Sequence, residues 1–243
     1  NPMPSGNCGI LWRMQRTSID AVEIHPSSAV RASIIWLHGL GADGNDFAPL
    51  IPQLGIVEPL GVRVVLPHAP RRPVTINNGM VMRAWYDIAA ADFRASEDEA
   101  GIRESASLVD ALIDREVERG VPPDCILLAG FSQGGAIALH AALRYPEKLA
   151  GLMALSTYLP LGSSLDAEVV DNAAAVNDGI PVFMAHGTFD PVLPMQMGVD
   201  SRDLLRDRGF EIEWHEYPMA HAVCAEEIAH IRQWLLRAFD AAE

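Results

Sequence analysis

The chain has 243 residues, of which 49% are hydrophobic, and its formal net charge is −14. This length and composition are typical of a single globular domain, here residues 1–243, with 1–18 as an irregular N-terminal segment. The charge argues against nucleic acid or an anionic membrane surface as a partner, and no apolar run is long enough for stable membrane insertion.

Strand-like and helix-like segments alternate along most of the chain. The predicted strands lie near Ala21 and at 32–37, 61–66, 125–129, 149–155, 181–186 and 211–217, and the predicted helices at 46–54, 97–119, 134–145, 195–208 and 223–239. Such alternation predicts an α/β fold with a mostly parallel central sheet and helices on both faces. Two longer irregular stretches, 67–96 and 157–179, are too short to form a large cap domain.

A glycine-rich loop, Gly39 to Gly44, follows the strand at 32–37 and matches G-x-G-x-x-G. A dinucleotide site is disfavoured, because the next strand ends in Pro67-His68 with no acid for a ribose, and prolines interrupt the following helix. In hydrolases a glycine loop at this point presents a backbone amide to a developing oxyanion. The amide of Leu40 is the candidate.

The strand at 125–129 breaks at G-x-S-x-G and continues into an Ala- and Leu-rich helix. The pattern alone is common, but a strand, a sharp turn and a helix are the context that a nucleophile elbow requires. Glycines at Gly130 and Gly134 leave room where a Cβ would clash. Ser132 is therefore the predicted nucleophile, and the amide of Gln133, at the start of the helix, is a second oxyanion donor.

In the α/β-hydrolase order, the acid and then the base follow the serine, each after a later strand. Asp190 follows the strand at 181–186, and His221 follows the strand at 211–217. Asp190 would accept the Nδ1 hydrogen of His221 and stabilise the imidazolium. His186, which ends a strand, is the reserve candidate for the base, and His215 is predicted to be a solvated strand residue.

Five motifs in order resemble those of the phospholipase/carboxylesterase family: HGLGADGND at 38–46, RAWYDI at 83–88, GFSQGG at 130–135, HGTFDPV at 186–192 and AH at 220–221. The family contains small bacterial carboxylesterases and acyl-protein thioesterases (lysophospholipases), and the likeness runs from about residue 29 to the C-terminal helix. The resemblance implies an α/β-hydrolase fold without a cap, the triad Ser132, Asp190 and His221, and an oxyanion hole formed by Leu40 and Gln133. It also implies small-molecule ester or thioester substrates and no cofactor.

Specificity should reside in the irregular stretches, since loops at the carboxyl ends of strands surround the site. The apolar candidates for an acyl groove, helped by Leu40, are Ile76, Met82, Trp85, Leu159 and Val192. Two alternatives stay open: a serine peptidase of the same fold, and a binding module of this fold that has lost catalysis.

The remaining polar residues suggest little further chemistry. No C-x-x-C pair or H-E-x-x-H motif is present, so a metal site is not expected. Three cysteines and the lack of a basic-then-apolar N-terminal pattern favour reduced thiols and a cytoplasmic location. Acidic runs such as 97–99 and 226–227 are predicted to be solvated at helix starts. The sequence leaves open whether two chains form a homodimer.

Overall fold

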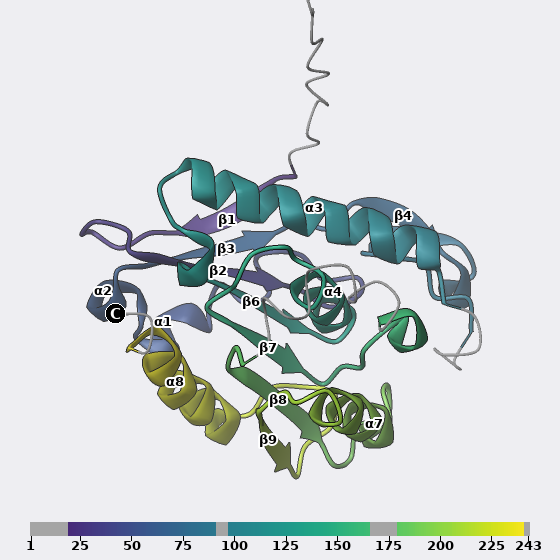
Figure 1. Cartoon of the computed structure of the whole chain (residues 1–243). Coiled ribbons are helices and arrows are strands. Elements are labelled where there is room, and N and C mark those ends of the chain that lie inside the picture. Colours follow the sequence, from purple (N-terminus) through teal and green to yellow (C-terminus); the bar gives the residue numbers. More distant parts are fainter. Residues whose placement is uncertain (1–18, 91–96, 166–178, 241–243) are drawn as a thin grey trace, which may run out of the picture.

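The computed structural model describes residues 19–90, 97–165 and 179–240 (Figure 1), so the segment 1–18 lies outside the described residues. Its main sheet has seven strands in the order β1-β3-β2-β6-β7-β8-β9. The strands are β1 (Ala21–Ile24), β2 (Ala32–Leu37), β3 (Val62–Pro67), β6 (Ile126–Phe131), β7 (Gly151–Leu155), β8 (Val182–Gly187) and β9 (Ile212–Tyr217). Only β1 is antiparallel to its neighbour, so the predicted, mostly parallel sheet is confirmed.

Helices cover both faces of this sheet (Figure 1). One face carries α3 (Glu99–Glu118), α4 (Gln133–Ala142) and α7 (Met195–Arg206), and the other carries α1 (Ile51–Leu54) and α8 (Ala225–Asp240). Within β2, Ile35 and Leu37 pack into the first core, whereas Ile34 and Trp36 pack into the second. Because successive strand residues point to opposite faces, a sheet covered on both sides needs continuous apolar strands of this kind.

The helix predicted at 46–54 is much shorter than expected. It forms only the single turn of α1, followed by the equally short α2 (Val57–Leu60). Gly55 ends α1 in the left-handed region at φ 57°, and Pro52 lies in its first turn. The prolines and Gly55 therefore divide the segment into single turns, since neither residue type supports a continuous helix interior.

A small antiparallel hairpin lies in the stretch 67–96, which was expected to be irregular. It consists of β4 (Arg71–Val74) and β5 (Met80–Arg83), joined by the 3₁₀ turn η1 (Thr75–Asn77). Asn78 and Gly79 follow this turn with positive φ angles of 56° and 73°. An Asn-Gly pair between apolar runs is a recognised hairpin signal, so the sequence carried a signal for this element. Two further 3₁₀ turns are η2 (Pro123–Cys125) and η3 (Gly162–Ser164).

The acidic residues at the two helix starts behave differently from one another. Asp98 is the N-cap of α3 and accepts a hydrogen bond from the amide of Gly101 at 3.0 Å, and Glu226 at the start of α8 is exposed. Glu227, in contrast, is fully buried, so the prediction of a solvated pair was wrong for this residue. Its place on α8 turns the side chain toward the sheet rather than toward water.

The parallel strands all end at one edge of the sheet. The loops after β2, β6, β7, β8 and β9 therefore meet there, as is usual for ligand sites in α/β folds. Among the described residues, no helix is both long and apolar enough to cross a bilayer.

Candidate active site

Ser132 occupies the sharp turn between β6 and α4. Its backbone has a φ of 54° and a ψ of −124°, a region that residues other than glycine seldom adopt. A Cβ at Gly130 would collide with the backbone of Gly134, and a Cβ at Gly134 would collide with the carbonyl oxygens of Leu37 and His38. Both glycines are therefore needed for the chain to turn this tightly.

A hydrogen-bond chain joins Ser132 to residues from two other strand ends. The Ser132 Oγ lies 2.8 Å from the Nε2 of His221, whose Nδ1 lies 2.6 Å from the Oδ2 of Asp190. The other carboxylate oxygen of Asp190 accepts the amides of Val192 and Leu193, both at 2.9 Å. Since Nδ1 faces a carboxylate, it carries the proton, which leaves the lone pair of Nε2 for the serine hydroxyl.

His186 lies near this chain but not at Ser132. Its ring is fully buried, with Nε2 at 2.9 Å from the Leu193 carbonyl oxygen and 3.5 Å from the Asp190 Oδ2. Burial lowers the pKa of His186, so the ring is neutral. The reserve assignment of His186 as the base is therefore corrected: its ring supports the loop that carries Asp190.

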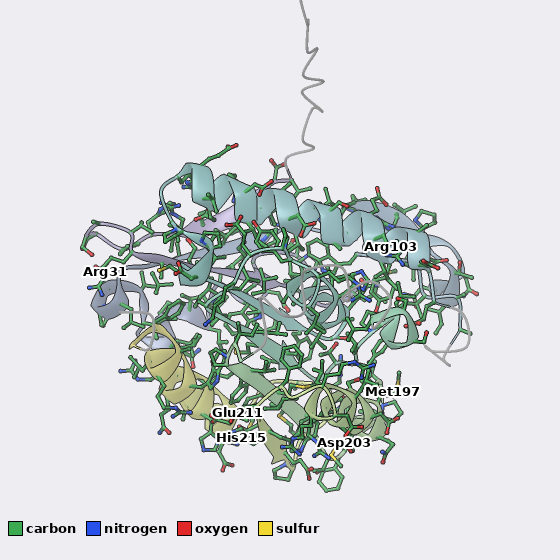
Figure 2. The ribbon with its side chains drawn as sticks, viewed as in Figure 1. Arg31, Arg103, Met197, Asp203, Glu211 and His215 are labelled. Carbon is green, nitrogen blue, oxygen red and sulfur yellow. The ribbon has the colours of Figure 1, made fainter. Side chains whose placement is uncertain are left out.

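His215 is not the solvated strand residue that its alternation with Trp214 predicted. Its ring stacks on Phe183 and on His230 of α8, with centroids 5.1 and 4.6 Å apart. His215 itself lies on β9, at the edge of the sheet (Figure 2). The sheet face that carries Glu213 and His215 is covered by α8, which strand alternation alone does not reveal.

The loop after β2 lies against the serine. A Cβ at Gly39 would lie 3.4 Å from the Ser132 Cβ. The buried His38 braces this loop: its Nδ1 donates to the Gly39 carbonyl oxygen at 2.7 Å, and its Nε2 accepts the Ala69 amide at 3.0 Å. Within the part of the chain that the structure describes, the amides of Leu40 and Gln133 donate no hydrogen bond. Both N–H groups thus remain available beside Ser132.

A cavity of about 190 Å³ lies directly beside Ser132. Leu40, Ile76 and Val192 line it, as the sequence predicted. The other lining residues are Asn77, Tyr86, Ile88, Ser132, Gln133, Tyr158 and Leu193, so no charged side chain is among them. No group of three or more His, Cys, Asp or Glu residues that could hold a metal ion occurs in the described ranges.

Three of the predicted groove residues do not line this cavity. Trp85 is completely buried, and its Nε1 donates to the His38 carbonyl oxygen at 2.9 Å, so it supports the loop before Leu40 from within the core. Leu159 lines a separate cavity beside Ser201 and Leu204. Met82 lies in β5 of the hairpin, where its Sδ accepts the side-chain amide of Asn77 at 3.3 Å.

Sequence reasoning missed the two tyrosines of the cavity, although each is adjacent to a residue that was chosen. Tyr86 follows Trp85, and Tyr158 precedes Leu159. Outside helices, consecutive side chains point to different sides, so a shift of one residue exchanges a core position for a cavity position. The signal that could have identified them is the tyrosine side chain itself, because its apolar ring and polar hydroxyl suit the lining of a partly polar cavity.

The side chain of Gln133 has a structural role that the sequence did not suggest. Its Oε1 accepts the amide of Trp85 at 2.9 Å, and its Nε2 donates to the carbonyl oxygen of Tyr86 at 2.7 Å. The residue after the serine therefore holds the segment that carries Tyr86.

Comparison with known proteins agrees with this architecture. Residues 19–238 match the family model described as Phospholipase/Carboxylesterase. Acyl-protein thioesterase 1 of Neurospora crassa is 43% identical over 211 residues, covering 84% of this chain and 85% of that protein. Acyl-protein thioesterase 1 of Cryptococcus neoformans var. neoformans is 38% identical over 239 residues, covering 91% and 98%.

Solved structures show the same fold. The crystal structure of Arabidopsis thaliana SOBER1 has a TM-score of 0.78 and 32% identity, covering 86% of this chain and 99% of that one. Acyl-protein thioesterase 2 of Zea mays has a TM-score of 0.81 and 29% identity, covering 90% and 99%. The predicted α/β-hydrolase fold is thus confirmed. From the extent of the family match and the identity to these relatives, the chain is a serine hydrolase that belongs to the phospholipase/carboxylesterase family.

Proposed function

We propose that this chain is a carboxylesterase that cleaves carboxylic esters and thioesters, lysophospholipids among them, through Ser132, His221 and Asp190. The observation that carries the proposal is the hydrogen-bond chain of 2.8 and 2.6 Å that ends beside an uncharged cavity. The printed names of the relatives, acyl-protein thioesterases, support the thioester part.

The proposed reaction has two acyl-transfer steps. His221 Nε2 accepts the Ser132 proton while Oγ attacks the carbonyl carbon, and the Leu40 and Gln133 amides stabilise the negative charge on the carbonyl oxygen. His221 then protonates the departing alcohol or thiol. Water, activated by the same imidazole, hydrolyses the acyl-enzyme and restores Ser132.

The buried environment of Asp190 supports its proposed role. Its side chain is fully shielded from solvent, and its two oxygens accept hydrogen bonds from His221 and from two backbone amides. A carboxylate held by several donors has little freedom to rotate. It therefore orients the imidazole and stabilises the imidazolium that forms during attack.

The test is covalent labelling with a fluorophosphonate probe. We expect the parent protein to be labelled, the Ser132→Ala variant to be unlabelled, and a Ser163→Ala variant, altered at an exposed serine, to be labelled like the parent. Labelling that survives in Ser132→Ala would refute the assignment of the nucleophile, and a parent that resists labelling would favour a binding module.

A substrate comparison separates esterase from peptidase. Esters and thioesters have better leaving groups than amides, so kcat/KM on simple esters and thioesters should exceed that on peptides of matched acyl group by at least about 100-fold, or about 3 kcal/mol in activation free energy. Peptide cleavage as fast as ester cleavage would instead support the peptidase alternative.

A further inference from the structure

Two buried tyrosines meet in the cavity beside Ser132. The hydroxyl oxygens of Tyr86 and Tyr158 lie 3.2 Å apart, and both residues are about 2% exposed. Both line the same cavity as Ser132. Acyl transfer at Ser132 needs neither hydroxyl, so their presence in an otherwise mostly apolar pocket calls for another role.

The exposure of the lining residues distinguishes an outer end of the cavity from an inner end. Ile76 and Val192 are 39% and 53% exposed and form its outer part. Ile88, Leu193 and the two tyrosines are buried and form its inner part. An acyl chain attached to Ser132 and extending inward therefore approaches the two tyrosines.

The position of both tyrosines relative to the nucleophile is fixed by hydrogen bonds. The Gln133 side chain, next to Ser132, holds the backbone of residues 85 and 86 with bonds of 2.9 and 2.7 Å. The hydroxyl of Thr157, which precedes Tyr158, donates to the Ser132 carbonyl oxygen at 2.7 Å. The hydroxyl pair is therefore a built part of the pocket and not a mobile surface feature.

The cavity volume limits the length of the chain that fits. At about 30 Å³ for a water-sized group, 190 Å³ holds roughly six non-hydrogen atoms. This corresponds to a carbonyl group and about four further atoms. A longer chain must continue out of the cavity.

The hydroxyl pair suits a neutral, polar chain end. Burial raises the pKa of Tyr86 well above its usual value, and the neighbouring Tyr158 and the charge of Glu97 raise it further, so the phenol keeps its proton. The same burial and the same acidic neighbour disfavour a carboxylate at the chain end. A phenol oxygen has two lone pairs, so Tyr86 can accept a hydrogen bond whichever tyrosine donates to the other.

We propose that the inner end of this pocket is a specificity subsite in which Tyr86, supported by Tyr158, hydrogen-bonds a neutral hydroxyl on a short acyl chain. This inference rests on the proposed esterase function. It assigns the two tyrosines as specificity-determining residues that act on the acyl group.

The test compares two esters of equal size, ethyl 4-hydroxybutanoate and ethyl pentanoate. The first carries a hydroxyl group where the second carries its terminal methyl group. The ethanol released on acylation is followed, with the uncatalysed rate subtracted, because the 4-hydroxyl group can close the ester or the acyl-enzyme to a lactone that releases no acid. The readout is the ratio of the two kcat/KM values, hydroxyl over methyl, because general damage to the enzyme lowers both values together. Removing one hydrogen bond changes such a ratio by about three- to tenfold.

We expect this ratio to fall by about three- to tenfold in Tyr86→Phe and at least as far in the Tyr86→Phe, Tyr158→Phe double variant. The matched control is Tyr145→Phe, which loses a hydroxyl that donates to Asp114 rather than to the pocket, and its ratio should equal that of the parent. A ratio unchanged in the double variant overturns the subsite while leaving the esterase proposal intact. A parent that hydrolyses neither ester overturns both.

Discussion

At the scale of single residues, the site depends on three side chains delivered by the ends of three strands. Ser132, Asp190 and His221 follow β6, β8 and β9, and their hydrogen bonds are 2.8 and 2.6 Å long. The His221 ring also packs on Phe131 with centroids 4.7 Å apart, which limits its rotation. This geometry places one imidazole between a hydroxyl and a carboxylate.

The first prediction concerns cooperation within this group. Ser132→Ala and His221→Ala should each lower kcat on a simple ester by a factor on the order of 10⁴ to 10⁶, and the double variant should lose little more, because the residues act as a unit. Steady-state kinetics measure the loss, and circular dichroism checks that the fold persists. Additive losses, or residual activity within tenfold of the parent, would contradict the assignment.

The second prediction concerns Trp85, which is a core support and not a groove residue. Trp85→Phe removes the donor to the His38 carbonyl oxygen and loosens the loop that carries Leu40. We expect kcat/KM to fall by about tenfold, and equally for acetate and hexanoate esters, because a misplaced amide weakens stabilisation of every oxyanion.

The contrasting control for Trp85 is Val192→Ala, which alters the exposed outer lining of the cavity. This variant should change the hexanoate-to-acetate ratio, since acetate hardly extends past the carbonyl group. If Trp85→Phe changed the hexanoate-to-acetate ratio and Val192→Ala did not, Trp85 would have to be assigned as a groove residue.

At the scale of elements, the turn between β6 and α4 is coupled to the end of β2. Gly134 lies so close to the carbonyl oxygens of Leu37 and His38 that no Cβ fits between them. Those oxygens belong to backbone at the carboxyl end of β2, which cannot move without displacing the Gly39–Leu40 segment. The turn that carries Ser132 and the loop that carries Leu40 therefore form one packed unit.

The third prediction follows from this coupling. Gly134→Ala should lower the free energy of unfolding by about 1–3 kcal/mol or more and should also abolish most esterase activity, because overpacking here shifts backbone atoms. Urea unfolding and ester kinetics measure the two effects. Gly120→Ala is the comparison: Gly120 has a φ of 93° with no atom near its Cβ position, so that variant should lose stability alone.

At the scale of the whole molecule, stability depends on pH through a buried acid. Glu227 is fully buried on α8, and burial raises its pKa to about 8 despite an opposing contribution from the Cys224 backbone. In the unfolded chain a Glu titrates near 4.5. Between these two values the folded state retains a proton that the unfolded state releases, so Glu227 makes the folded state less stable as pH rises.

The fourth prediction tests this linkage. Glu227→Gln, which stays neutral, should raise the free energy of unfolding at pH ~7.5 by at most about 3–4 kcal/mol, which is several degrees in Tm, and the gain should disappear near pH ~4.5. Glu226→Gln, at the exposed neighbour, should show no such pH-dependent gain. If the free energy of unfolding of Glu227→Gln differed from that of the parent by the same amount at both pH values, the assignment of a buried, neutral carboxyl group would be wrong.

The sequence by itself determined the α/β class, the mostly parallel sheet and the places of Ser132, Asp190 and His221 along the chain. These follow from local information: apolar runs that predict strands, a glycine pattern that permits one sharp turn, and an order of strand ends that places three loops on one edge. Each expected strand of the main sheet lies within two residues of the observed one. Local patterns suffice here because every parallel strand ends at the same edge.

Only the tertiary structure decided which side chains face the cavity and which face the core. Trp85 and Leu159 were expected in the groove, but Tyr86 and Tyr158, one position away, line it. Glu227 was expected in water, yet it lies in the core. Such outcomes depend on which distant parts of the chain pack against a residue. A shift by one position in a loop or on a helix changes the packing partner, although the local sequence pattern stays the same.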